Sequence, residues 1–268
     1  MIIPLDSLNI AAVVVVGLVS LKIKIIDRTG FLAATFVGLS ILVFGGLKWF
    51  VILLSFHFIA GLFTRYNYSR KMKMEAAEAK GGARGWKNVL SNGVATSLLA
   101  ICYSRTFNGA FAAGYLGAIS TSIADTLATE IGLLNPCEPR LITNLHTKVK
   151  AGVSGGVTLL GEVSCMFGSA MIALVALIIG FEGLDIPQII LFNLLIGFLG
   201  CNFDSLLGAT VQVTFKCQVC GILTEKKIHC ELPTEYYKGI RFMDNNLVNF
   251  ISTIFGALVA IFFYFEIT

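Results

Sequence analysis

Charged residues are scarce in this sequence. Only 13% of its 268 residues are Asp, Glu, Lys or Arg, whereas soluble domains carry about 25%. Hydrophobic residues make up 56%, and the mean hydropathy is +0.82. This shortage of solvating charge argues against a soluble protein. The first 20 residues also lack the basic stretch and the small-residue cleavage site of a secretory signal peptide, so we expect the first apolar run to remain as a membrane helix.

Apolar runs of membrane-spanning length recur along the whole chain. A spanning helix needs about 20 mainly apolar residues. Eight such segments can be drawn, with seven as the alternative because only residues 45–48 join the second and third. The segments are 9–26, 31–47, 49–64, 89–103, 109–132, 154–181, 186–211 and 247–266. The sequence therefore predicts an all-α fold, in which residues 1–268 form a single transmembrane helix bundle.

Basic residues are almost missing from every second connection. The connections after the first, third, fifth and seventh segments hold 18 of the 20 Lys and Arg residues, and the others hold only Lys48 and Arg105. Because basic loops stay in the cytoplasm, both termini are predicted to lie outside, and the long loops 65–88, 133–153 and 212–246 inside. We expect an integral protein of the cell membrane with its active face toward the cytoplasm. Charge spread over four loops gives no case for nucleic-acid binding, and the oligomeric state stays open.

Residues 66–80 combine basic, aromatic and Met side chains. This composition is typical of a helix lying in the membrane interface. A solvated linker helix explains it equally well, so both interpretations are kept.

Four acidic residues fall inside the predicted helices: Asp125, Glu130, Glu162 and Asp204. A carboxylate in a bilayer is costly and usually lines a site or a water-filled cavity. All four lie near the predicted cytoplasmic ends of their helices. Asn residues open the fourth and eighth segments at the same depth, namely Asn88, Asn92, Asn245, Asn246 and Asn249. Ser154, Thr158 and Glu162 are spaced by four and predict a polar stripe on one helix. We therefore expect one cavity facing the cytoplasm.

Two glycine-rich stretches with basic neighbours lead into predicted helices. One is residues 80–85, which include Lys80 and Arg84, and the other is residues 152–158, just after Lys148. Glycine lets backbone N–H groups approach an anion, and a helix N-terminus favours negative charge. Neither stretch has the Walker pattern, and close helix packing is the alternative. Beside intramembrane carboxylates, they indicate phosphates bridged to Asp by Mg²⁺.

Three of the seven cysteines cluster in the loop 212–246. Cys217 and Cys220 form a CxxC pair, and His229 and Cys230 follow eight residues later. Three thiols and an imidazole are the ligands of a structural zinc site, although an adjacent His-Cys pair is an unusual second half. Free thiols are the alternative. A catalytic zinc is not expected, because four protein ligands would close the site.

Several short motifs, taken in order, resemble the DUF92 family of integral membrane proteins over about residues 20–265. The first are Lys80-Gly81-Gly82-x-Arg84, Asn88-x3-Asn92-Gly93, Ala124-Asp125-Thr126-x2-Thr129-Glu130 and Pro139-Arg140-Leu141-Ile142-Thr143. The later ones are Ser154-Gly155-Gly156-Val157-Thr158, the motif from Asp204 to Gln212, the cysteine loop and Asn245-Asn246-x2-Asn249. That family includes a phytyl-phosphate kinase, which converts an isoprenyl monophosphate to the diphosphate and is thought to use CTP.

The resemblance implies roles for the residues already singled out. An isoprenyl phosphate in the membrane and a nucleoside triphosphate would meet in the cavity, where the catalytic residues would be Asp125, Asp204, Lys80, Arg84 and Glu130. Mg²⁺ would be held by Asp125 and Asp204, with Glu162 or Glu130 assisting. Phosphate or nucleotide would be bound by Gly81, Gly82, Asn88, Asn92, Thr129, Arg140, Lys148, Ser154, Gly155, Gly156, Thr158, Gln212, Asn245, Asn246 and Asn249. Gly155 and Gly156 would donate backbone N–H groups.

Other classes of protein explain the pattern less well. An ion-coupled secondary transporter is the main alternative, because its intramembrane carboxylates bind H⁺ or Na⁺. Transporter sites usually lie near the midplane, whereas the polar residues here lie toward one side. The DG-x-x-AR signature of CDP-alcohol phosphotransferases is absent. A purely structural membrane protein would give no reason for four inward carboxylates.

Overall fold

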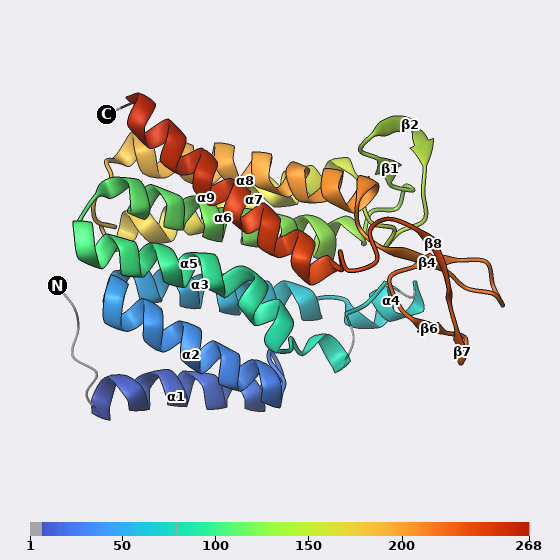
Figure 1. The fold of residues 1–268 in the computed structure, drawn as a ribbon, viewed down its shortest axis with the longest axis horizontal. Coiled ribbons are helices and arrows are strands. Elements are labelled where there is room, and N and C mark those ends of the chain that lie inside the picture. The colour runs from blue at the N-terminus through green and yellow to red at the C-terminus, as the bar shows by residue number, and fades with distance from the viewer. Residues whose placement is uncertain (1–6, 75, 79, 268) are drawn as a thin grey trace.

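The computed structural model describes residues 7–74, 76–78 and 80–267 and shows a bundle of long helices (Figure 1). Each long helix coincides with one predicted apolar segment. They are α1 (Ser7–Lys22), α2 (Arg28–Gly45), α3 (Leu47–Arg65), α5 (Trp86–Thr106), α6 (Gly109–Gly132), α7 (Leu159–Ile178), α8 (Ile186–Thr210) and α9 (Asn245–Ile267). Five of them, α2, α3, α7, α8 and α9, are long and apolar enough to cross a membrane. A count of eight spanning helices stays a prediction, as does the orientation of the termini.

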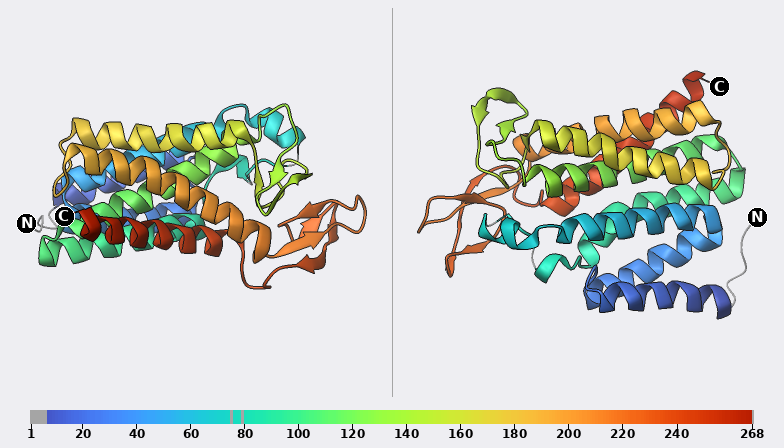
Figure 2. Two further views of the ribbon diagram at one scale, coloured as in Figure 1. Left: turned by 90° about the horizontal axis from the view of Figure 1, so that it is seen from above. Right: turned by 180° about the vertical axis from the view of Figure 1, so that it is seen from behind.

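Short elements gather at one end of the bundle, which we call the loop end (Figures 1 and 2). They include the helix α4 (Tyr68–Lys73) and the 3₁₀ turn η1 (Lys80–Gly82). The strands are β1 (Arg140–Leu141), β2 (Asn144–Lys148), β3 (Gly156–Val157), β4 (Thr214–Lys216), β5 (Leu223–Thr224), β6 (Ile228–His229), β7 (Leu232–Pro233) and β8 (Glu235–Lys238). They pair as β2-β1-β3, β5-β4-β8 and β6-β7. The all-α prediction therefore misses three small sheets, whose strands are too short to show a periodic pattern.

Helix α6 forms the centre of the bundle. Its sequence is rich in Gly, Ala, Ser and Thr, and it packs against α7, α8 and α9. Small side chains let helix backbones approach closely, which is how membrane helices commonly associate. Helix α6 also contacts α3, where Trp49 is buried. The hydroxyl of Tyr115 on α6 donates a hydrogen bond of 2.6 Å to the carbonyl oxygen of Trp49. This packing and this hydrogen bond fix the position of α6 within the bundle.

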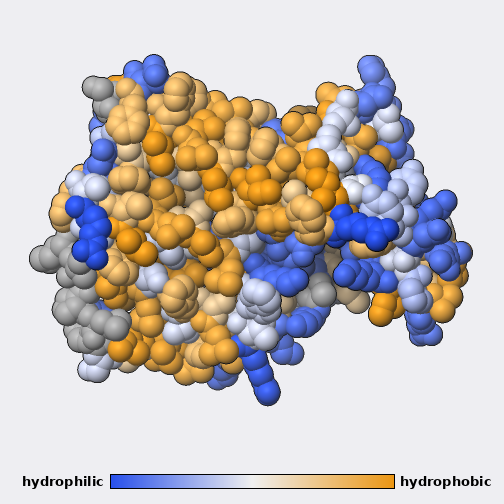
Figure 3. Space-filling model, viewed as in Figure 1, coloured by the Kyte–Doolittle hydropathy of each residue, from blue (hydrophilic) through white to orange (hydrophobic). Residues whose placement is uncertain are grey.

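The outer surface of the helices is apolar (Figure 3). Large hydrophobic side chains are exposed on several helices, among them Leu32, Phe36, Ile178, Leu258 and Phe262. Hydrophilic residues gather instead at the loop end (Figure 3). Exposed apolar surface on this scale marks contact with lipid or with another protein, and the length of the helices favours lipid.

Two local predictions fail. Helix α7 begins at Leu159 rather than at residue 154, because Thr158 caps it: its hydroxyl accepts a hydrogen bond from the N–H of Gly161. Ser154 therefore lies in a turn, and the polar stripe with Glu162 does not form on one helix. Of the helix predicted over 66–80, only the six residues of α4 are helical, while residues 75 and 79 lie outside the described part.

Candidate functional site

A polar cavity of about 160 Å³ opens at the loop end, between the ends of α6, α7, α8 and α9 and the loops beside them. Its wall is unusually acidic. The carboxylates in the wall are Glu78, Asp125, Glu130, Glu162, Asp204 and Glu225. Among the described residues, the lining contains one basic side chain, Arg84. We call this space the polar cavity.

The polar cavity brings together most of the residues that the sequence singled out. All four intramembrane carboxylates line it, although they come from three helices. The other predicted residues in its wall are Arg84, Asn88, Thr129, Ser154, Gly155, Gly156, Thr158, Gln212, Asn245 and Asn249. The glycine loop reaches the wall because Gly155, whose φ is +79°, packs directly on Ala209 near the end of α8, where a side chain would collide.

Several polar atoms in this wall have no hydrogen-bond partner among the described residues. They are the Oδ2 atom of Asp204, the Nε2 atom of Gln212, the Oδ1 atom of Asn249 and the Nε atom of Arg84, all buried. Unpaired buried polar atoms are rare, since each costs the free energy of its lost hydration. Four of the nine such atoms among the described residues line this one cavity, which supports a site for a polar ligand there.

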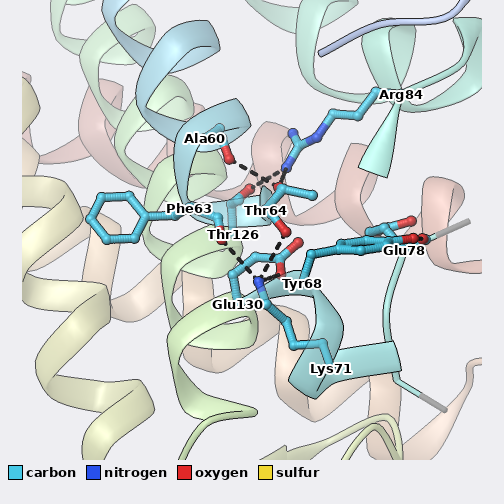
Figure 4. A network of polar contacts seen from close by, with 9 residues as sticks. All are labelled: Ala60, Phe63, Thr64, Tyr68, Lys71, Glu78, Arg84, Thr126 and Glu130. Atoms are coloured by element: carbon cyan, nitrogen blue, oxygen red, sulfur yellow. Dashed lines mark hydrogen bonds and ion pairs between the residues drawn. The ribbon is translucent and has the colours of Figure 1, made fainter. Parts of the chain in front are cut away.

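Backbone hydrogen bonds to the connection between α1 and α2 hold Arg84 in place. Its N–H donates to the carbonyl of Ile25 at 2.9 Å, and its carbonyl accepts from the N–H of Asp27 at 3.0 Å. Gly30 permits this approach, because a side chain there would collide with the carbonyl oxygen of Arg84. Within the described part of the chain, the guanidinium makes two hydrogen bonds, both long at 3.4 Å, to the hydroxyls of Thr64 and Thr126 (Figure 4). It therefore keeps donors for an anion.

A second cavity, of about 70 Å³, adjoins the first and is mainly apolar. It lies among α1, α2, α3 and α5, and Val13, Val37, Phe50 and Leu53 are in its wall. The two cavities share Arg84 and Asn88. We call this space the apolar cavity. A ligand bound at Arg84 could thus extend one part into each environment.

Glu130 is engaged by a lysine that sequence reasoning did not select. The ammonium of Lys71 on α4 lies 2.5 Å from the Glu130 carboxylate and donates to the carbonyls of Phe63 and Thr64 at 2.9 and 3.0 Å (Figure 4). The side chains of Lys71 and Glu130 are 0% and 6% exposed. Breaking a buried pair is far costlier than breaking a surface pair. Glu130, which was predicted as a catalytic residue, therefore anchors α4 to α6 while it lines the polar cavity.

Lys80 and its two glycines lie outside the polar cavity. The Lys80 ammonium is 2.6 Å from Asp27, and this hydrogen bond lowers the pKa of the Asp27 carboxyl well below its usual range. Gly81 and Gly82 adopt φ values of +70° and +85°, which favour glycine. The stretch therefore forms a turn fastened to the start of α2, and it does not build the predicted phosphate cradle.

Other predicted phosphate ligands also lie elsewhere. Arg140 is exposed on β1 and donates to the carbonyl of Leu145 at 2.6 Å, while Lys148 on β2 is exposed and 3.9 Å from Glu138. Asn92 lines the apolar cavity and donates to the carbonyl of Asn88 at 2.9 Å. Asn246 is not in either wall. The N–H of Gly156 bonds the carbonyl of Val153 at 3.0 Å and is not available to a phosphate.

The donors fit a hydrated magnesium ion better than a closed metal cage. Mg²⁺ usually takes one or two carboxylates and completes its shell with waters and phosphate oxygens. Asp204 offers an unpaired oxygen, and Asp125 lines the same cavity. Glu162 already accepts a hydrogen bond of 3.0 Å from Asn202. Among the described carboxylates, no group of three comes close enough to share one ion. Asp125 and Asp204 are thus the better candidates.

The predicted zinc ligands do meet. The ligand atoms of Cys217, Cys220, His229 and Cys230 all lie within 4.8 Å of one another. The backbone N–H groups of Cys220 and Val219 lower the pKa of the Cys217 thiol to about 6. This shift favours the thiolate of Cys217, which is the form that binds metals, whereas burial raises the pKa of the Cys230 thiol to about 11.

Sequence reasoning missed two acidic residues in the wall of the polar cavity, Glu225 and Glu78, and also Lys71, which pairs with Glu130. Glu225 accepts a hydrogen bond of 2.6 Å from the Ser154 hydroxyl, although 71 residues separate them. Glu78 and Lys71 come from the connection between α3 and α5. Glu225 and Glu78 lie in polar loops, where acidic residues are ordinary, so their hydropathy carried no signal. The apolar residues around Asp125 and Asp204 supplied that signal.

The fold and the cavity define an integral membrane protein with a polar cavity at one end of its helix bundle. The chain belongs to the DUF92 family of integral membrane proteins, whose model matches residues 11–257. The resemblance read from the motifs is thereby confirmed.

Similar proteins occur in archaea, plants and cyanobacteria. An uncharacterized membrane protein of Methanocaldococcus jannaschii is 31% identical, with 96% of this chain and 93% of the relative covered. Protein PGR of Arabidopsis thaliana is 30% identical over 91% of each chain. An uncharacterized membrane protein of Synechocystis is 26% identical, with 83% and 77% covered. No solved structure matches.

Proposed function

We propose that this protein phosphorylates a lipid monophosphate, using a nucleoside triphosphate that enters the polar cavity from the loop end. The observation that carries the proposal is the junction of the two cavities at Arg84 and Asn88. A lipid phosphate has one apolar part and one anionic part. The apolar cavity would take the hydrocarbon next to the head group, and Arg84 would neutralise the phosphate.

The chemistry requires little from a general base. A phosphate monoester is already a nucleophile at neutral pH, so positioning and charge neutralisation dominate phosphoryl transfer. The unpaired amide N–H of Gln212 would donate to a phosphate oxygen, and the unpaired Oδ1 atom of Asn249 would accept a hydrogen bond from a donor group of the nucleotide. Asp125 and Asp204 would hold Mg²⁺, which supplies the positive charge that brings a triphosphate into an acidic cavity.

The finer identity of the substrates rests on the family resemblance. The phytyl-phosphate kinase of this family supports an isoprenyl tail and CTP as the donor. The distribution of Lys and Arg between the connections supports a cytoplasmic position for the loop end in the cell membrane. We include these features in the proposal.

The test is a direct assay of the detergent-purified protein. Geranylgeranyl or phytyl monophosphate is incubated with Mg²⁺ and with CTP, ATP, GTP or UTP in turn, and the lipid diphosphate is measured. We expect product with one preferred nucleotide and a loss on the order of 100-fold in Asp125→Asn, the scale seen when one charge-stabilising group is removed from a site. Glu182→Gln is the matched control, because Glu182 pairs with Lys48 outside both cavities. Full activity in Asp125→Asn would refute the metal assignment.

The excess of carboxylates in the polar cavity favours one second candidate, an ion-coupled transporter. The same preparation in liposomes distinguishes the two. Uptake driven by a Na⁺ or H⁺ gradient, with no diphosphate formed from any nucleotide, would support transport and contradict the kinase.

A further inference from the structure

We propose that Cys217, Cys220, His229 and Cys230 bind a structural Zn²⁺, and that this ion holds Glu225 at the mouth of the polar cavity. The four ligand atoms lie within 4.8 Å of one another. All seven cysteines are free of disulfide bonds. The metal site is separate from the proposed phosphoryl transfer and is tested without it.

The spacing of the ligand atoms matches tetrahedral zinc. The Nδ1 atom of His229 is 3.5 Å from the sulfur of Cys220 and 3.2 Å from that of Cys230. Zn–S bonds of about 2.3 Å and Zn–N bonds of about 2.0 Å place neighbouring tetrahedral ligands roughly 3.5 Å apart. Three thiolates and one imidazole also complete the coordination of a structural zinc ion and leave no open position for catalysis.

The first pair of ligands lies in a tight turn between β4 and β5. The N–H of Cys217 donates to the carbonyl of Ile222 at 2.9 Å, and the N–H of Gly221 donates back to Cys217 at 3.0 Å. Gly221 has a φ of +72°, a conformation that glycine adopts readily. The turn therefore directs both CxxC sulfurs toward one point.

The second pair lies at the tip of the β6–β7 hairpin. Its two turn residues, Cys230 and Glu231, have φ values of +49° and +63°. Two-residue hairpin turns with positive φ favour Asn and Gly, so Cys and Glu are poor choices for the turn itself. A ligand role explains why a cysteine occupies this position beside His229.

Zinc would connect these two turns and thereby fix the segment between them. Glu225 follows β5 directly, five residues after Cys220 and four before His229. Its carboxylate accepts the hydrogen bond of 2.6 Å from Ser154 in the glycine loop. With both ends of the segment held by one ion, Glu225 stays in the wall of the polar cavity. Glu225 is therefore a positioning residue for the glycine loop.

The experiment begins with metal analysis of the full-length protein, purified without chelators. We expect close to one zinc per chain in the wild type and almost none in Cys220→Ser. Cys137→Ser is the matched control, because Cys137 is exposed and lies outside the cluster. It should retain the zinc. A wild type that holds no zinc, even after incubation with Zn²⁺, would overturn the proposal.

A second measurement tests the positioning of the loop. Lys226 and Lys227 are exposed and offer trypsin a cleavage site next to Glu225. We expect a strong chelator to accelerate cleavage there at least tenfold in the wild type, and added Zn²⁺ to restore protection. Glu225→Gln should still bind zinc. Cleavage that is equally slow with and without bound zinc would refute the idea that the ion orders this segment, even if zinc is present.

Discussion

The polar and apolar cavities touch at Arg84 and Asn88, yet they are built in different ways. The apolar cavity is enclosed mainly by the faces of four helices, α1, α2, α3 and α5. The polar cavity is enclosed by helix ends and by loops that carry β3 and Glu225. The helix faces around the apolar cavity offer a ligand mainly apolar side chains. Loops and helix ends can direct charges and hydrogen bonds at it.

The polar groups in the two walls differ in a second respect. In the apolar cavity they are largely paired with each other: His57 and Ser20 lie 2.9 Å apart, and Asn92 bonds the carbonyl of Asn88. In the polar cavity Asp204, Gln212 and Asn249 keep unpaired atoms. Polar groups that are already hydrogen-bonded need no ligand, whereas unpaired buried groups can form hydrogen bonds with one. We therefore expect the apolar cavity to tolerate lipid tails of different lengths and the polar cavity to recognise its ligand strictly.

The largest effect is expected at the junction itself. Arg84→Met keeps the length of the side chain but removes its charge, so kcat/KM for the lipid phosphate should fall on the order of 100-fold. Arg84→Lys should recover only part of this activity, because a lysine lacks the planar, forked donor geometry. Steady-state kinetics with varied lipid phosphate measure both. Arg105→Met, at an exposed position outside both cavities, is the matched control. If Arg84→Met and Arg105→Met lost activity equally, Arg84 would not be part of the binding site.

The carboxylates of the polar cavity were predictable because charge inside an apolar segment is conspicuous. Asp125, Glu162 and Asp204 were found this way and do line one cavity. The predicted helix boundaries agree with the structure to within a few residues, because polar residues mark the ends of the apolar segments. The error at α7 arose because Thr158 was taken as part of a helix that it caps.

The basic residues were harder to place, because a charge in a loop carries no information about its partner. Lys80 and Lys148 looked like phosphate ligands, but they lie near Asp27 and Glu138. Lys71 looked like a residue of an interfacial helix, but it is buried against Glu130. Apart from Lys148 and Glu138, which share one loop, these pairings depend on how segments far apart in the sequence fold together, as does the contact of Glu225 with Ser154.

A smaller effect is expected for a substitution in the wall of the apolar cavity. Ala34 of α2 lines the apolar cavity, and Ala34→Leu would fill part of its volume. We expect KM for a long-chain lipid phosphate to rise about tenfold, within the range that a few methylene groups can produce in a hydrophobic pocket. The KM for the nucleotide should not change. Ala12→Leu on α1 is the matched control, because Ala12 is exposed and does not line the cavity. An unchanged lipid KM in Ala34→Leu would place the tail elsewhere.

The smallest effect is expected for Lys148→Ala. Lys148 is exposed on β2, 3.9 Å from Glu138, and does not line the polar cavity. Exposed ion pairs contribute roughly 0–1 kcal/mol, so kcat/KM should change less than about twofold and the melting temperature very little. The contrast between the two cavities depends on this result. It assumes that, among the basic residues of the described lining, Arg84 alone recognises the phosphate. A tenfold loss in Lys148→Ala, above all one that weakens with added salt, would mean that the β2-β1-β3 sheet closes over the polar cavity when substrates bind. Recognition would then be shared between the helix bundle and a moving loop.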